Sequence, residues 1–359
     1  MPTFTGTLNS NEIFGAIWNM IISQQVFANP ISTDSASIVD SARVDGGLYG
    51  DTKLYYSTDA LKSYEWANDA EATNLLALHR PDAPEVQAIT LDIFRQIPVT
   101  VDNYLTKRAF ADEGTFAQFN GVVLGWLRDT KRVYDLTTYN AFLGCEITNV
   151  GNQVQTVTGV AVAEPANEAA ARLEAMTLGK FLADLFAELN DPNRDYNDYG
   201  HLRAYDEGRI KVIWNVNYLN RLRYIDLPTI FHNDNLIKQI TSMKMLPKYF
   251  GTVNAAATVG DGSTVRSLIE QDIGNNHYFA GEIIAKTDTA PAGTSYTEDD
   301  EVICKIVVGD LPPMMSAFET STSFFNPKSL TENHYLTWGH NTLEHLKEYP
   351  FITLKASSK

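Results

Sequence analysis

Carboxylates and amides are concentrated in one short polar run, DPNRDYNDYG. Asp191, Asn193 and Asp195 have the spacing of the first three ligands in an EF-hand loop, which binds calcium through carboxylate and amide oxygens. The sixth position is Tyr196, where the turn needs glycine, and the twelfth is Leu202, where a glutamate should chelate the ion. The favoured interpretation is a polar turn between a helix and a strand, with a metal site as the alternative.

Two further motifs invite a ligand-binding interpretation. His340, Glu344 and His345 lie close together, but they miss the His-Glu-x-x-His spacing that places both imidazoles on one helical face. A partly exposed polar turn is therefore the favoured interpretation there. The run GDGSTV at 260–265 resembles a phosphate-binding loop, yet it has no lysine to contact phosphates. We expect no cofactor.

The composition is that of an ordinary folded protein with an acidic balance. Of 359 residues, 44% are hydrophobic and 20% are charged, and the formal net charge is -16. That charge argues against a protein that wraps nucleic acid, because such binding neutralises phosphates with Lys and Arg. The two cysteines, Cys145 and Cys304, cannot build a disulfide framework or a four-cysteine zinc site. Both are expected to be reduced in a cytoplasmic fold.

The N-terminal part has no features of a membrane span or a signal peptide. Its most apolar run, at 13–22, is shorter than the roughly 20 residues that cross a bilayer. The first basic residue is Arg43, so the positive region of a signal peptide is missing. Helical spacing predicts a helix over 11–27, and the small polar residues at 31–42 predict an extended arm. We expect no membrane partner.

Hydrophobic periodicity predicts mixed helices and strands in the remainder of the chain. Helical spacing over 115–142 predicts a single rod of roughly 40 Å at about 1.5 Å per residue. The other elements expected from the pattern are a helix over 167–189 and strands over 145–162, 209–216, 281–288, 300–310, 333–340 and 351–356. This order of elements is an α+β pattern.

A long two-stranded ribbon is predicted between residues 44 and 103. LYGDTKLYYS and VQAITLDIFRQIPVTV alternate like strands, and Pro98 places the second at a sheet edge. The segment between them is too polar for a buried element. Because an isolated ribbon is marginal in water, a neighbouring subunit is expected to support it. The aromatic side chains of Tyr55, Tyr56, Tyr64 and Trp66 are then interface anchors.

The order of arm, ribbon, long helix, mixed domain and closing strands resembles the HK97-type major capsid protein of tailed double-stranded DNA bacteriophages. It is most similar to the versions in small short-tailed phages. The stretches that carry the likeness are IFRQIPVTVDNYLTKRAF, FAQFNGVVLGWLRDTKRVYDLTTYNAFLG, NRDYNDYGHLRAY, IWNVNYLNRL, IFHNDNL, LPKYFG and NHYLTWGHNTLEHLKEYPFITLKA. The likeness covers most of the chain, although it rests on element order and weak local similarity.

The resemblance implies a domain organisation and a structural role. The implied divisions are an N-terminal arm over 1–43, an extended loop over 44–103, a P-domain with the spine helix over 104–143, an A-domain over 144–321 and C-terminal strands of the P-domain over 322–359. The implied function is self-assembly, as hexamers and pentamers, into the icosahedral shell of a virion that forms in the host cytoplasm. Neither catalysis nor a cofactor is implied.

The resemblance also implies partners and an inter-subunit surface. The residues expected at that surface are Lys53, Tyr55, Tyr56, Lys62, Tyr64 and Trp66 of the loop, and Trp18 and Phe27 of the arm. Some relatives join a loop lysine to an asparagine of a neighbour, but no acceptor is identified here for Lys53 or Lys62. A portal and a separate scaffolding protein are expected partners. The acidic balance implies weak, non-specific contact with packaged DNA, confined to basic clusters at 107–108 and 128–132.

Two other functions stay open at this point. A portal or tail component is another virion structural protein that a long central helix would suit. A metal-dependent hydrolase could use the cluster from Asp191 to Asp198, but it would need further ligands from distant parts of the sequence.

Overall fold

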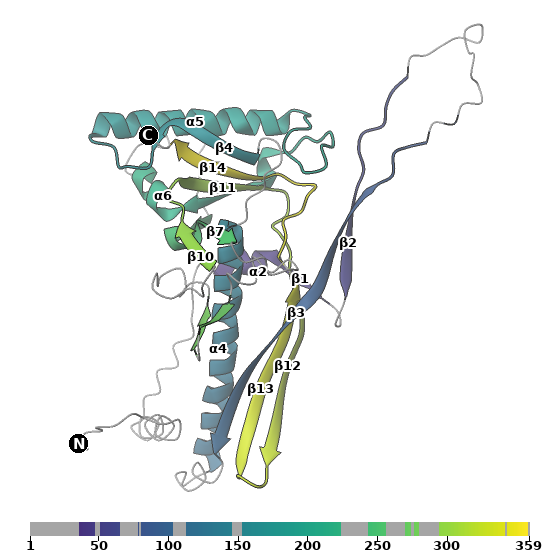
Figure 1. The fold of residues 1–359 in the computed structure, drawn as a ribbon, viewed down its shortest axis with the longest axis vertical. Coiled ribbons are helices and arrows are strands. Elements are labelled where there is room, and N and C mark those ends of the chain that lie inside the picture. Colours follow the sequence, from purple (N-terminus) through teal and green to yellow (C-terminus); the bar gives the residue numbers. More distant parts are fainter. Residues whose placement is uncertain are drawn as a thin grey trace.

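One long helix, α4 (Glu113–Cys145), runs beside a five-stranded sheet and ends beneath a second five-stranded sheet (Figure 1). The computed structural model describes residues 36–46, 51–64, 78, 80–102, 113–145, 153–223, 243–255, 270–273, 276–279, 294–341 and 343–357. The long helix predicted over 115–142 is confirmed, and so is the α+β class.

The first sheet has the strand order β1-β12-β13-β3-β2. Its strands are β1 (Arg43–Asp45), β2 (Thr52–Ser57), β3 (Glu85–Asp102), β12 (Met314–Asn326) and β13 (Thr331–Asn341). Neighbours are antiparallel, except that β1 runs parallel to the start of β12. Strand β3 pairs with β2 through residues 85–90 and with β13 through residues 91–102. At Pro98 it therefore has one partner among the described strands, which confirms the predicted edge position.

Alternate side chains of β13 pack against α4. Leu336 and Trp338 belong to the same buried apolar cluster as Leu127 and Tyr134 of the helix. Tyr134 contacts Trp338 edge to face and shares a hydrogen bond of 2.9 Å with Nε2 of His340. His340 is only 1% exposed. The expected partly exposed turn at this residue is wrong, because the two-residue period of the strand points its side chain toward the helix.

The second sheet has the order β4-β14-β11-β5-β6. Its strands are β4 (Val154–Ala161), β5 (Ile210–Asn215), β6 (Met243–Met245), β11 (Val302–Val308) and β14 (Phe351–Ser357). Helices α5 (Glu168–Asn190) and α6 (Val216–Arg223) pack on one face, where Val212 and Ile306 are buried. On the other face, Ile213 and Val307 share a cluster with Phe142 of α4. The predicted helix at 167–189 is confirmed.

Short elements complete the described part of the chain. They are the 3-10 turns η2 (Glu207–Arg209) and η3 (Pro247–Tyr249), the antiparallel pair of β7 (Gly251–Ala255) with β10 (Thr294–Glu298), and the antiparallel pair of β8 (Glu270–Ile273) with β9 (Asn276–Phe279). Among the described residues, no helix combines the length and the apolar character needed to cross a membrane.

The N-terminal region is helical where the structure describes it. Helix α2 (Ala36–Ala42) buries Ile38 and Val39 in the cluster around α4. The extended arm expected over 31–42 is therefore wrong at these residues, because two adjacent apolar side chains within a polar run supply a contact with the core. The predicted helix over 11–27, with Trp18 and Phe27, lies outside the described residues.

The C-terminal strands are divided between the two sheets. Strand β12 begins at Met314, before the expected domain boundary at 322, and β14 lies in the second sheet between β4 and β11. The segment 322–359 therefore contributes strands to both sheets. After Asn341 the chain crosses between the sheets, and the apolar residues of β14 are buried where they pair with β11.

Candidate inter-subunit surface

A ribbon (residues 52–64, 78 and 80–90) projects from the first sheet (Figure 1). The ladder between β2 and β3 ends at the pair Ser57 and Glu85. The described residues beyond Asp59 are exposed, and their apolar side chains remain in solvent: Leu61 is 80% exposed, Tyr64 67% and Leu78 81%. The distal part of the ribbon therefore holds apolar surface that its own chain leaves uncovered.

The pleat of β2 separates two neighbouring tyrosines. Tyr55 is half-buried and packs against a small core cluster made of Ile89, Leu91, Met315 and Leu346. Burial, with the nearby charge of Asp310, raises the pKa of Tyr55. Tyr56 points to the opposite side and is 60% exposed. Tyr55 therefore supports the fold of its own chain, while Tyr56 can contact another molecule.

Tyr56 belongs to an apolar outer face of the ribbon, formed by Leu54, Tyr56, Val86 and Ala88. Tyr56 pairs across the strands with Val86, and Leu54 pairs with Ala88. Leu54 is 51% exposed and Val86 is 47% exposed. A single exposed apolar residue needs no explanation, but a contiguous apolar face marks an interaction site. The opposite face carries Lys53, which is half-buried.

The structure locates only part of the predicted surface. Lys62 and Tyr64 lie in the exposed segment beyond the ladder. Trp66 lies outside the described residues, as do Trp18 and Phe27. The outer face also contains Leu54 and Val86, which aromatic content alone did not identify. Strict alternation along both strands was the signal that could have found them.

A polar clamp holds the base of the ribbon. Nη2 of Arg203 donates to the carbonyl oxygen of Thr58 at 2.6 Å, and Nη1 of Arg194 lies 2.6 Å from Oδ2 of Asp59. The backbone N–H of Leu202 donates to the other carboxylate oxygen of Asp59 at 2.9 Å. The bonds from Arg194 and Leu202 hold the pKa of Asp59 below its ordinary value. We call these five residues the clamp.

A second set of contacts fixes the loop that carries Arg194 and Leu202 of the clamp. Oδ2 of Asp198 lies 2.8 Å from Nε2 of His345, and Oδ1 accepts from Nε2 of Gln153 at 2.7 Å. Gln87 of β3 donates to the carbonyl oxygen of His345 and accepts from the N–H of Lys347. Burial alone would raise the pKa of Asp198, but the hydrogen bonds and charge of its partners outweigh it, so the pKa is lowered.

Side-chain to backbone hydrogen bonds hold the acidic run after α5. Nδ2 of Asn193 donates to the carbonyl oxygens of Glu188 and Asp191, and its Oδ1 accepts from the N–H of Asp195. This is a polar turn, as favoured from the sequence. No group of three or more His, Cys, Asp or Glu among the described residues could hold a metal. The run at 260–265 lies outside the described part of the chain.

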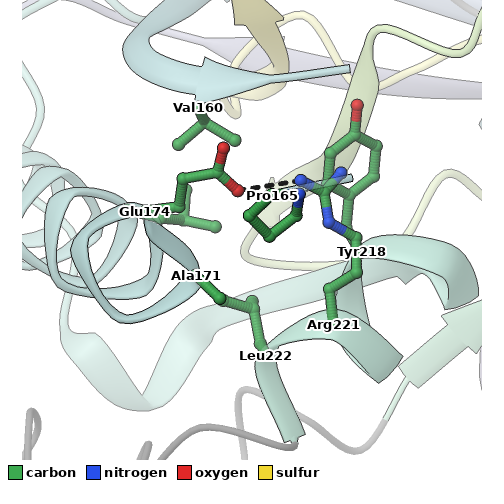
Figure 2. A pocket seen from close by; sticks show the side chains of 8 residues that line it. Val160, Pro165, Ala171, Glu174, Tyr218, Arg221 and Leu222 are labelled. Carbon is green, nitrogen blue, oxygen red and sulfur yellow. Dashed lines mark hydrogen bonds and ion pairs between the residues drawn. The ribbon is translucent and has the colours of Figure 1, made fainter. Parts of the chain in front are cut away.

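A small pocket between α5, α6 and the end of β4 is lined by Arg221 among other residues (Figure 2). Arg221 lies 2.8 Å from Oε2 of Glu174, stacks over the ring of Tyr218 at 5.0 Å and donates to backbone carbonyl groups of residues 161–163. The remaining cavity is about 20 Å³, which is room for about one water molecule. The arrangement fixes the loop after β4 to the two helices.

One basic cluster expected to face DNA is partly buried. Lys131 is 6% exposed, and its Nζ lies 3.3 Å from Oδ2 of Asp135. The same carboxylate accepts from Nη2 of Arg43 at 3.1 Å. Asp135 therefore ties helix α4 to Arg43 of β1, and Lys131, which is buried beside the same carboxylate, is corrected as a member of the expected basic cluster. The cluster at 107–108 lies outside the described residues.

Comparisons with known proteins identify the fold. No family model matches the sequence, and no curated protein matches it at a significant level. A chain from the capsid structure of Staphylococcus phage Andhra has a TM-score of 0.61 at 11% identity, covering 88% of this chain and 83% of that chain. The chain has the HK97-type capsid fold. A chain from the structure of head fiber and inner core protein gp22 of native bacteriophage P68 has a TM-score of 0.59 at 9% identity, covering 87% and 83%.

The HK97-type fold confirms the resemblance suggested by element order. The comparison does not extend to individual residues at such low identity, so the ribbon face and the clamp are argued from this chain alone. Within the HK97-type fold, the clamp explains how one long ribbon leaves the sheet in a defined direction.

Proposed function

We propose that the chain is a major capsid protein that self-assembles, as hexamers and pentamers, into the icosahedral shell around a phage double-stranded DNA genome. The observation that carries the proposal is the ribbon: a chain with a capsid fold holds an apolar face away from its own core. Burial of such a face is favourable at about 25 cal/mol per Å². A second copy of the chain supplies the missing surface.

The proposed domain organisation follows the capsid fold. It comprises an N-terminal arm over 1–43, the extended loop over 44–103, a P-domain built on α4 and on β12 and β13, and an A-domain built on the second sheet with α5 and α6. Strand β14 joins the A-domain in this organisation, because it pairs with β4 and β11.

The proposed interface places the outer face of the ribbon on an adjacent copy. Lys62, Tyr64 and Trp66 extend it, and Trp18 and Phe27 of the arm contribute to it. The clamp limits the directions that the ribbon samples, which lowers the entropy cost of docking. A defined ribbon direction favours one shell geometry over aggregates.

The proposed setting is the virion, with assembly in the host cytoplasm. Proposed partners are a portal, a separate scaffolding protein and the packaged DNA. The net charge of -16 supports weak contact with DNA, since like charges repel. Catalysis and cofactors are not part of the proposal, and of the carboxylates in the former hydrolase candidate, that of Asp198 is held by Gln153 and His345.

Sedimentation of the purified chain over a range of concentrations, with negative-stain imaging of the fastest fraction, tests the proposal. We expect closed shells, or rings of five and six copies, with or without an added scaffolding protein. Replacing residues 61–81 by a short glycine-rich turn retains the clamp, and this variant should fold but fail to assemble. Assembly of that variant at the wild-type concentration would contradict the role of the ribbon. A ring of one other fixed size, without shells, would indicate a portal or tail component.

A further inference from the structure

The first sheet has two edges without a described partner strand. On one side, β1 pairs only with residues 314–316 of β12, and no described strand covers residues 317–326. On the other side, β2 is the last strand of the sheet. The backbone N–H and C=O groups along such an edge form a template for a strand from another molecule.

The open edge of β12 lacks the features that normally prevent such pairing. Residues 320–326 read TSTSFFN, with no charge and no proline. Phe324 is 63% exposed and Phe325 is 47% exposed. By contrast, the one-sided stretch of β3 at 91–102 carries Arg95 and Pro98, and charged residues and prolines block strand addition. One edge is protected and the other is left able to pair.

We propose that residues 317–326 of β12 accept strand β2 of a second copy of this chain, so that the first sheets of neighbouring copies join edge to edge. This inference rests on the proposed shell-forming function and names the contact that builds it. The two edges are opposite ends of one sheet, so the pairing is head to tail. Head-to-tail contacts close into rings when the rotation between copies allows it.

The two edges match in length, charge and position. Strand β2 has 6 residues, which span roughly 20 Å, and residues 317–326 offer about 33 Å. The only charged residue of β2 is Lys53, and residues 320–326 carry none, so no like charges oppose the pairing there. Figure 1 shows β2 at the base of the projecting ribbon, on the side of β3 away from β13.

A pair of proline variants tests whether the edge is used. Neighbouring residues of a strand direct their N–H groups to opposite sides, so only one of Thr322→Pro and Ser323→Pro removes a bond to β13. That variant should lose monomer stability and serves as the control. The other should unfold like the wild type, yet its assembly threshold, the lowest concentration that gives shells or rings, should rise at least tenfold.

The outcomes separate this inference from the proposed function. If the stable proline variant assembles at the wild-type threshold, the edge pairing is wrong while the shell function stands. If the wild-type chain forms neither shells nor rings, with scaffold or without it, both are wrong. Should both proline variants prove unstable, cysteine pairing decides the question.

Cysteine pairing also identifies the added strand. Copies with Thr320→Cys, Thr322→Cys or Phe324→Cys are mixed with copies that carry Lys53→Cys or Leu54→Cys, and the assembled material is oxidised. Oxidised wild type controls for its own cysteines. We expect disulfides that join a β12 position of one copy to a β2 position of another. Disulfides between β12 positions alone, or none beyond the wild-type background, would overturn the assignment of β2.

Discussion

Alanine substitutions at the adjacent residues Tyr56 and Tyr55 should have different effects. Tyr56→Ala should weaken assembly, whereas Tyr55→Ala should weaken the fold. Tyr56 is 60% exposed, and a tyrosine buries about 150–250 Å² when fully covered. Roughly 100 Å² is therefore left for a neighbouring copy to cover, which is worth about 2.5 kcal/mol at about 25 cal/mol per Å². At about 1.4 kcal/mol per tenfold change, Tyr56→Ala should raise the assembly threshold about 60-fold.

The same substitution should leave the isolated chain intact. An exposed side chain away from other features changes the free energy of unfolding by about 0.5 kcal/mol or less. Tyr55→Ala is the matched control, since Tyr55 packs on the core cluster with Leu91 and Met315. A half-buried tyrosine lost from that cluster should lower the free energy of unfolding by about 2 kcal/mol.

Two measurements check the pair. Urea unfolding of the unassembled chains gives the free energies of unfolding, and sedimentation at fixed salt gives the assembly thresholds. The reasoning is refuted if Tyr56→Ala assembles at the wild-type threshold. It is equally refuted if Tyr56→Ala destabilises the isolated chain as much as Tyr55→Ala does, because the two residues would then share one environment.

Three further predictions concern the clamp and the core. Arg203→Ala should accelerate hydrogen exchange at residues 58–64, since it removes a charge-assisted bond to the base of the ribbon. Arg203→Lys should restore only part of the protection. Equal exchange in the wild type and both variants would contradict the clamp. Because the folded-state pKa of Asp198 is lowered, its carboxylate stabilises the fold above about pH 4, and this effect is lost as the pH falls through the folded pKa. The free energies of unfolding of wild type and Asp198→Asn should therefore differ at pH 7 and converge in acid. Gly144→Ala should destabilise the chain by about 2 kcal/mol or more in urea, because the added Cβ would overlap the backbone carbonyl of Tyr249; an unchanged midpoint would show that the backbone there yields freely.

The main elements could be predicted from the sequence because their patterns are local. Helix α4 follows from apolar residues at helical spacing, and the edge position at Pro98 follows from a missing backbone donor. The capsid resemblance also came from the order of such elements. By contrast, the prediction of an extended arm was wrong at α2, because Ile38 and Val39 pack in the cluster around α4. No local sequence pattern shows that contact.

The candidate surface was only partly predictable. Alternation along β2 puts Tyr55 and Tyr56 on opposite faces, and this much follows from the sequence. The tyrosine that packs on the core is decided by the position of Met315 and Leu346. These two residues come from distant parts of the chain. The sequence therefore predicted a ribbon with interface aromatics, and the tertiary structure decided which aromatic is available.

The sequence by itself determined the class of the fold, the long helix and the existence of a ribbon, because periodicity and backbone chemistry act between near neighbours. Only the tertiary structure decided what the acidic run after α5 does. Arg194 in this run holds Asp59, and Arg203 just after it holds Thr58, both more than a hundred residues earlier in the chain. Residues that close such a long loop leave no periodic signal, since their partner is chosen by the packing of whole elements.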